Sequence, residues 1–218
     1  IGAGAWGTAL ASVARRAGRD VVLHAHEVKT ADAINTDHVN AVFLPDIPLD
    51  PAIRATTDLD DAVAEADALL MVTPAQFLRP TLAQIATARP PAAPIVICAK
   101  GIELDSGKLL NEVTEEVAPD ANLAVLSGPT FAAEVARGLP TAVTLACATP
   151  DTATALTEAL GTPSFRPYTA SDIVGAEVGG AIKNVIAIAC GVVDGRGLGQ
   201  NARAAVIARG LAEITRFA

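Results

Sequence analysis

The sequence predicts an α/β protein with a doubly wound, mainly parallel sheet over residues 1–170, followed by the start of an all-helical second domain over residues 171–218. Three observations support this prediction. The chain opens on a glycine-rich turn made by Gly2, Gly4 and Gly7. Apolar runs of strand length then alternate with helix-like segments, as is typical of a doubly wound sheet. Beyond about residue 170 the strand pattern stops and only helix-like segments follow.

The opening turn has the G-x-G-x-x-G spacing of a Rossmann-type dinucleotide-binding βαβ unit. The first glycine allows the tight turn, the second lets the backbone approach a pyrophosphate, and the third lets helix and strand pack closely. We expect a helix from about Ala5 to Ala17 that directs its free N–H groups at that anion. A strand over Asp20–Leu23 follows, after Gly18. Only Ile1 precedes the motif, so we expect most of the first strand to be missing.

The other elements of the first domain are predicted from apolar runs and from helix-capping residues. Apolar runs of the kind that buried parallel strands require predict strands at Ala68–Val72, Ile95–Ala99 and Leu123–Leu126. β-branched residues predict another strand at Thr141–Cys147, and the last predicted strand is Phe165–Tyr168. Helices are predicted at Thr30–His38, at Asp58–Ala66 with Thr57 as cap, at Gln76–Ala88, from Ser106 as cap to about Val117, after Thr130 to Arg137, and at Asp151–Leu160. The proline-containing segment Phe43–Leu49 is predicted to be an extended loop.

The second domain begins with a long predicted helix from Asp172 to about Val193, capped by Ser171. A glycine-rich turn at Gly195–Gly199 separates it from a second helix, which runs from Asn201 to the end of the chain. Within the first of these helices, Ile173–Val193 is the longest apolar stretch in the sequence. It nevertheless carries Glu177, Lys183 and Asn184, and these polar groups argue against a membrane span.

Composition narrows the class of protein. Hydrophobic residues make up 51 % of the sequence and charged residues 18 %, which predicts a well-filled globular core. The net charge of −8, without runs of Lys or Arg, disfavours nucleic acid and anionic membranes as partners. Cys98, Cys147 and Cys190 have no metal-site spacing, so we expect no metal and read them as buried, reduced thiols of a cytoplasmic protein.

Two segments lie where parallel strands end and ligands bind. Lys100 follows the strand at Ile95–Ala99 and is therefore in a ligand position, although it could also be a surface lysine. Ser127–Thr130 joins a strand to a helix and is a second candidate anion site, or an ordinary capped helix. After the strand at Asp20–Leu23, Glu27 could bond an adenosine ribose, whereas His26 could tolerate a 2′-phosphate. The choice between NAD and NADP stays open.

Lys183 is the one cation in an apolar, small-residue helix that also contains Gly179 and Gly180. These glycines weaken the helix, which suggests that a backbone or a ligand approaches them closely. A desolvated lysine one turn further on could act as a general base near neutral pH. The alternative is a lysine that extends to solvent and pairs with an acid.

Together these motifs resemble the NAD(P)-dependent glycerol-3-phosphate dehydrogenases of the bacterial type, over essentially the whole chain and in the right order. The matching segments are Gly2–Leu10, Lys100–Glu103, Ser127–Ala132, Gly180–Val185, Asn201–Ala205 and Arg209–Glu213. The resemblance implies interconversion of sn-glycerol 3-phosphate and dihydroxyacetone phosphate with NAD or NADP, for phospholipid synthesis. It is compatible with a cytoplasmic homodimer.

The resemblance also implies a role for each matching residue. Lys183 corresponds to the catalytic proton acceptor. The residues that it places at the substrate are Lys100, Gly128, Thr130, Lys183 and Asn184. Those that it places along the cofactor are Gly2, Gly4, Ala5, Trp6, Gly7, His26, Phe77, Lys100 and Ala132. Ala5 stands where the family often has serine, so one phosphate hydrogen bond is lost.

The family's helical domain continues well past residue 218 and carries an arginine for the substrate phosphate. We therefore expect a chain truncated at both ends that binds dinucleotide but turns over poorly or not at all. Two other interpretations stay open. One is a different two-domain dehydrogenase acting on a hydroxy or keto acid. The other is a dinucleotide-binding module without catalysis.

Overall fold

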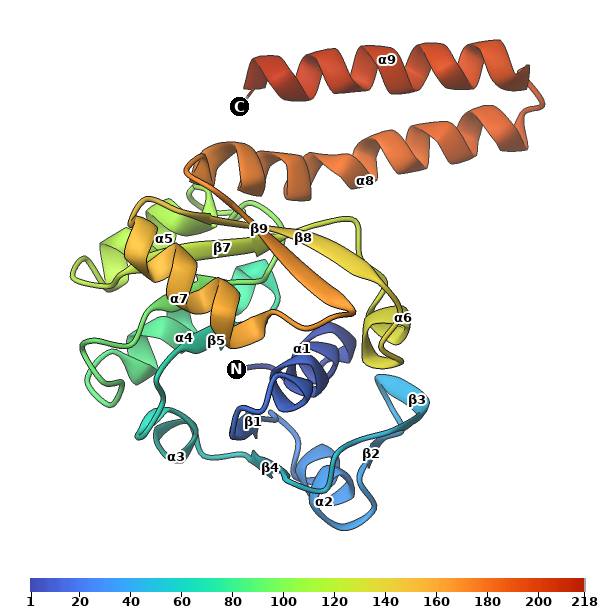
Figure 1. Ribbon diagram of the computed structural model, residues 1–218. Coiled ribbons are helices and arrows are strands. Elements are labelled where there is room, and N and C mark those ends of the chain that lie inside the picture. The colour runs from blue at the N-terminus through green and yellow to red at the C-terminus, as the bar shows by residue number, and fades with distance from the viewer. Residues whose placement is uncertain (218) are drawn as a thin grey trace.

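The computed structural model describes residues 1–217, and Figure 1 shows strands with helices packed around them. The strands are β1 (Val21–His24), β2 (Val39–Asn40), β3 (Leu44–Pro48), β4 (Ile53–Thr56), β5 (Leu69–Met71), β6 (Ile95–Ile97), β7 (Leu123–Ser127), β8 (Thr141–Cys147) and β9 (Phe165–Ala170). The helices are α1 (Ala5–Arg16), α2 (Val28–Thr36), α3 (Leu59–Val63), α4 (Leu78–Ile85), α5 (Leu110–Val117), α6 (Ala132–Ala136), α7 (Pro150–Leu160), α8 (Ile173–Gly195) and α9 (Gly199–Phe217), with a 3₁₀ turn η1 at Ala75–Phe77.

The strands confirm the predicted mainly parallel α/β fold. The largest sheet has the order β5-β6-β7-β8-β9, and all its neighbours are parallel except the antiparallel pair β7 and β8. Strands β1 and β4 form a separate parallel pair, and β2 and β3 form an antiparallel pair. Helices α1, α6 and α7 share one apolar cluster with the sheet, whereas α3, α4 and α5 share another. Both faces of the sheet are thus covered, as parallel strands require.

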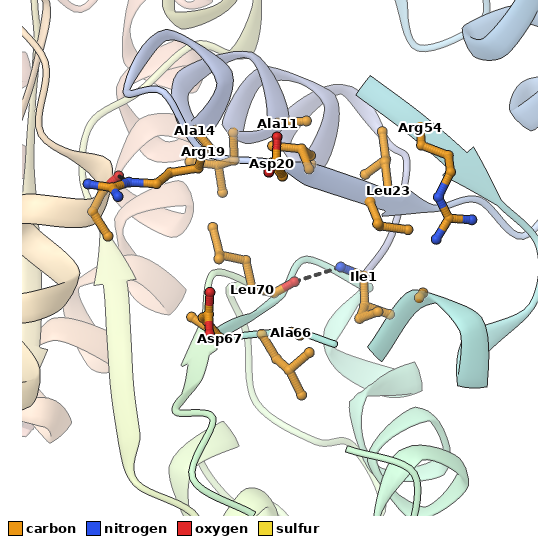
Figure 2. Close-up of a pocket in the computed structure, with 18 of the residues that line it drawn as sticks. Ile1, Ala11, Ala14, Arg19, Asp20, Leu23, Arg54, Ala66, Asp67 and Leu70 are labelled. Atoms are coloured by element: carbon orange, nitrogen blue, oxygen red, sulfur yellow. Dashed lines mark hydrogen bonds between the residues drawn. The ribbon is translucent and has the colours of Figure 1, made fainter. Parts of the chain in front are cut away.

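Residues 1 and 2 connect the two parallel strand groups. The Ile1 nitrogen donates to the Leu70 carbonyl at 2.7 Å, and the Val72 amide donates to the Ile1 carbonyl at 2.8 Å. On the other side, the Gly2 amide donates to the His24 carbonyl at 3.1 Å. A cavity of about 740 Å³ lies between β1 and β5, with Leu23 and Leu70 on opposite sides (Figure 2). This is where the sequence predicts the first strand.

The core is built mainly from aliphatic side chains, since aromatic residues make up only 3 % of the sequence. Phe165 and Leu10 are among its largest fully buried members. All three cysteines are buried and free, which confirms the burial expected for them. Their thiols contribute apolar volume to the core.

Several element boundaries differ from the predictions because tertiary pairing and capping act at the ends. The segment predicted as an extended loop contains β3, which pairs with β2. Helix α3 is capped by Asp58 rather than Thr57, since the Asp58 carboxylate accepts from the Asp60 amide at 2.9 Å. Helix α5 begins at Leu110, and Ser106 lies in the preceding loop.

The helical region shows a similar shift. The Asp172 carboxylate, rather than Ser171, caps α8 by accepting from the Gly175 amide at 2.8 Å. Helix α8 continues to Gly195, and α9 already begins at Gly199, so the connecting turn is shorter than predicted. The predicted helix over Gln76–Ala88 is split into η1 and α4.

Helices α8 and α9 form a hairpin on one side of the sheet, with α9 outermost (Figure 1). A Cβ at Gly210 would stand 2.5 Å from the Ile186 side chain, so the two helices meet where one lacks a side chain. By length and composition alone, α8 could cross a membrane, and only 22 % of its most apolar window is buried in the structure.

The turn between Ile1 and α1 leaves no space for a side chain at Gly7, and this constraint can be tested. A Cβ at this position would lie 1.8 Å from the Gly2 carbonyl oxygen, which is backbone and cannot swing away. We expect Gly7→Ala to lower the free energy of unfolding by about 2 kcal/mol through overpacking. Denaturant unfolding followed by circular dichroism would measure the change.

Gly191→Ala is the matched control, because Gly191 is also helical but no atom lies within 4 Å of its would-be Cβ. That substitution should be neutral or stabilise the protein by up to about 1 kcal/mol through helix propensity. Equal effects of the two changes would contradict the close packing at Gly7.

Candidate functional site

A pocket of about 420 Å³ lies where β5, β6 and β7 end and α1 begins. It is lined by Gly4, Ala5, Trp6, Gly7, Val72, Thr73, Pro74, Cys98, Ala99, Lys100, Thr130, Ala132 and Lys183. Residues from the first helix, three strand ends and α8 therefore meet at one place. The larger cavity between β1 and β5 contains neither lysine, so size alone does not identify the site.

The glycine-rich turn presents the N-terminus of α1 to this pocket. Gly4 caps the helix without a side-chain hydrogen bond, and the first intrahelical bond runs from the Thr8 amide to the Gly4 carbonyl at 3.0 Å. The amides of the first turn therefore stay available for an anion. Nothing lies within 4 Å of a would-be Cβ at Gly4, which leaves room for close approach. Gly2 supports the turn with φ of +106°.

Two ammonium groups share the pocket. The Lys100 Nζ lies 5.5 Å from the centre of the Trp6 ring, over its face. Burial lowers the pKa of Lys100, and the nearby charge of Lys183 lowers it further. The pocket lining contains no Asp or Glu. In a protein of net charge −8, this arrangement selects for an anionic ligand.

The environment of Lys183 differs from the one expected. The sequence suggested a desolvated lysine, but the Lys183 side chain is exposed and donates to the Asn184 side-chain oxygen at 3.0 Å. The alternative prediction, a lysine that extends to solvent, describes Lys183 better, although its hydrogen-bond partner is the Asn184 amide and not an acid. The desolvated lysine of the pair is Lys100, because it extends from a buried strand and Lys183 from a partly exposed helix.

Two residues of the pocket lining each carry a buried polar atom that lacks a hydrogen-bond partner among the described residues. The two atoms are the indole nitrogen of Trp6 and the hydroxyl oxygen of Thr73. Unpartnered buried polar groups are uncommon and often face a ligand. Together with the free first-turn amides of α1, they fit a dinucleotide. Sequence reasoning placed Thr73 at a strand end without giving it a role, and its burial became visible only in the structure.

The loop after Lys100 is fixed from outside the pocket. The Gln76 amide donates to the Ile102 carbonyl at 2.8 Å and accepts from the Leu104 amide at 2.9 Å. Arg79 makes two hydrogen bonds of 2.9 Å to Glu103 and holds the pKa of that carboxyl at about 2. Gln76 and Arg79 together thus hold residues 102–104 of the loop in place.

Cys98 also lines the pocket but is not a candidate nucleophile. Burial raises the pKa of its thiol to about 12, so the thiolate is scarce at neutral pH. Among the described residues, no group of three or more His, Cys, Asp or Glu side chains could hold a metal ion.

Five predicted site residues do not line the pocket: Gly2, His26, Phe77, Gly128 and Asn184. Gly2 lies beneath the turn, and Gly128 lies against β8, where its would-be Cβ meets Val143 at 3.1 Å. Phe77 is 61 % exposed. His26 is exposed beyond β1, next to Glu27, which caps α2 through its backbone.

Comparisons with known proteins find the same family in both the N-terminal and the C-terminal parts of the chain. Residues 1–153 match the family model described as NAD-dependent glycerol-3-phosphate dehydrogenase N-terminus, and residues 172–218 match the corresponding C-terminus. Glycerol-3-phosphate dehydrogenase [NAD(P)+] of Paramagnetospirillum magneticum is 63 % identical over all 218 residues, and that of Rhodospirillum rubrum is 62 % identical over 217. The chain spans 79 % of the length of the first relative and 62 % of the second.

A solved structure extends this likeness to three dimensions. The crystal structure of glycerol-3-phosphate dehydrogenase from Coxiella burnetii superposes with a TM-score of 0.93 at 38 % identity. The match covers 99 % of this chain and 66 % of that one.

The clamp on the Lys100 loop predicts a local effect of Gln76→Ala. Loss of two hydrogen bonds, each contributing about 1 kcal/mol, should make local opening of residues 102–104 about five- to thirtyfold more frequent. Hydrogen–deuterium exchange of the Leu104 amide measures this opening. Gln84→Ala, on the exposed face of α4, is the matched control and should leave the exchange unchanged. Unaltered exchange in Gln76→Ala would show that the amide does not hold the loop.

Proposed function

The chain belongs to the NAD-dependent glycerol-3-phosphate dehydrogenase family, and we propose that the protein interconverts sn-glycerol 3-phosphate and dihydroxyacetone phosphate with NAD or NADP. The observation that carries this proposal is the pair of lysines in an acid-free pocket at the N-terminus of α1. Such a pocket suits two anions, the pyrophosphate of a dinucleotide and the phosphate of a small substrate.

Lys183 is the proposed proton acceptor. In the oxidation, the C2 hydroxyl of glycerol 3-phosphate gives its proton to the Lys183 amine while C2 gives up a hydride. In the reduction, the Lys183 ammonium returns the proton to the forming alkoxide. When bound, the nicotinamide ring accepts or supplies the hydride. Asn184, which accepts a hydrogen bond from Lys183, orients that side chain beside the substrate.

Other residues bind and orient. Lys100 supplies positive charge to the substrate phosphate and to the cofactor, and Gly128 and Thr130 hold the substrate from the end of β7. The residues proposed along the dinucleotide are Gly2, Gly4, Ala5, Trp6, Gly7, His26, Phe77, Lys100 and Ala132. The unpartnered indole nitrogen of Trp6 supports its place in this set.

The wider context follows from this assignment. We propose residues 1–170 as the dinucleotide-binding domain and residues 171–218 as the beginning of a helical substrate domain. The product glycerol 3-phosphate would feed phospholipid synthesis in the cytoplasm. A homodimer without a membrane span is the assembly we propose, in which further protein surface covers the apolar face of α8.

Oxidation of NADH and NADPH by the full-length protein, with dihydroxyacetone phosphate or ketopantoate, tests the substrate class. Turnover with dihydroxyacetone phosphate alone is the expected result, and the faster cofactor then identifies the preference. Turnover with ketopantoate alone would replace the proposal by a keto-acid reductase. Binding of NADH without any oxidation would leave a non-catalytic module.

Replacement of Lys183 should separate chemistry from cofactor binding. We expect Lys183→Ala to reduce kcat in the full-length protein by about 10²- to 10⁴-fold, since general acid–base catalysis contributes that much. The dissociation constant for NADH, measured by fluorescence, should stay within about twofold.

Lys183→Arg keeps the positive charge but cannot accept a proton, so it should also be slow in the oxidation. Lys108→Ala removes a lysine outside the pocket and should keep normal turnover. Activity that survives Lys183→Ala would show that another group takes the proton.

A further inference from the structure

We infer that Glu177 is a positioning residue for the proposed reaction. Its carboxyl seats α8 on the first turn of α5, and this contact sets where Lys183 stands relative to Lys100. The inference rests on the proposed function, because Glu177 acts only through the position of Lys183, the proposed proton acceptor. Glu177 itself contacts neither substrate nor cofactor in this proposal. It is carried by a buried hydrogen bond, by two unpartnered oxygens and by the path of α8 to the pocket.

Glu177 is 6 % exposed, although glutamate is almost never buried without a partner. One carboxyl oxygen accepts a hydrogen bond from the Asn111 amide at 3.2 Å, in the first turn of α5. The other carboxyl oxygen and the Asn111 side-chain oxygen are both buried without a partner among the described residues. Two acceptors thus lack a donor, whereas a protonated Glu177 carries a hydroxyl donor of its own.

The charges around Glu177 favour that protonated form. Burial is the main cause that raises the pKa of Glu177 to about 7, and the carboxylates of Glu112 and Glu115 on α5 add to it. Strands β7 and β8, which also contact α8, contain no charged residue. On α9, Arg203 pairs with Asp194 and Arg209 pairs with Glu213. No described cation therefore offsets the buried carboxylate.

Helix α8 connects this contact to the pocket in two short steps. Gly180, one turn beyond Glu177, lies against Ser127 and Lys100: a Cβ there would be 2.9 Å from the Ser127 oxygen and 3.6 Å from the Lys100 side chain. Lys183 lies one further turn along the same helix. Because the three residues lie on one continuous helix, a shift at Glu177 is passed on to Gly180 and Lys183.

The sign of the pH dependence follows from the raised pKa. Glu177 binds its proton more tightly in the folded protein than in the unfolded chain, whose value is 4.5. Its contribution to stability is therefore full below that value and is lost as the pH rises through about 7. Ionisation leaves a charge buried against two other carboxylates, so the docking of α8 weakens at higher pH.

Kinetics of the full-length protein in both directions test the inference. We expect unaltered protein to show a decrease of kcat with a midpoint near pH 7 that has the same sign in oxidation and reduction. Proton transfer through Lys183 depends on pH with opposite signs in the two directions, so the two effects can be separated. Glu177→Gln keeps the acceptor for the Asn111 amide but cannot ionise, and it should abolish the shared decrease.

Glu177→Ala removes the contact and should lower kcat on the order of tenfold to a hundredfold, as misplacement of a catalytic group does. The KM and the NADH dissociation constant should change much less. Glu158→Gln, on the exposed face of α7, is the matched control and should reproduce the unaltered profile.

Two results would overturn the inference: a Glu177→Gln profile that superimposes on that of unaltered protein, or a Glu177→Ala variant with normal kcat and only a lower melting temperature. Should Glu177→Ala not fold, the Glu177→Gln profile still decides. Failure of the proposed function would look different, since unaltered protein itself would then show no turnover with dihydroxyacetone phosphate.

Discussion

The repulsion between two ammonium groups in one acid-free pocket is the constraint around which the site is built. Lys100 extends from a buried strand and Lys183 from α8, and burial together with the nearby charge of Lys183 lowers the pKa of Lys100. The N-terminus of α1 adds to the same positive field. An anion bound between the two lysines would offset the positive charge of both side chains and of the α1 N-terminus. The acidic residues of the protein lie outside this lining, so the field is kept in a molecule of negative net charge.

The lysines can meet only because the elements that carry them approach closely. Gly7 lets α1 pass over the turn, and Gly180 lets α8 lie on the ends of β6 and β7. A methyl group at Gly7 would clash with the backbone of the turn, and one at Gly180 would contact the side chains of Ser127 and Lys100. Glu177 adds a polar contact at the far edge of the same interface. Helix position, and with it the geometry of the pocket, thus depends on small residues and one buried carboxyl.

Local sequence patterns predicted most elements and missed those that depend on partners. The bounds of β8 were predicted correctly because its β-branched residues Thr141, Val143 and Thr144 favour a strand. The short strand β3 contains prolines and becomes extended only by pairing with β2. Caps shifted because neighbouring residues compete for the same amides, as Asp58 does with Thr57. The error at β3 concerns a partner strand that the local sequence does not identify, whereas the cap errors concern a choice between adjacent residues.

The sequence by itself determined the fold class, the glycine-rich turn before α1 and the choice of both lysines that line the pocket, since each depends on the order and spacing of nearby residues. The tertiary structure alone decided which lysine is desolvated, that the Thr73 hydroxyl is buried without a partner among the described residues, and that Glu177 is buried on α5. Burial and electrostatic environment arise from contacts between segments far apart in the chain. Those contacts exist only once the helices have packed on the sheet.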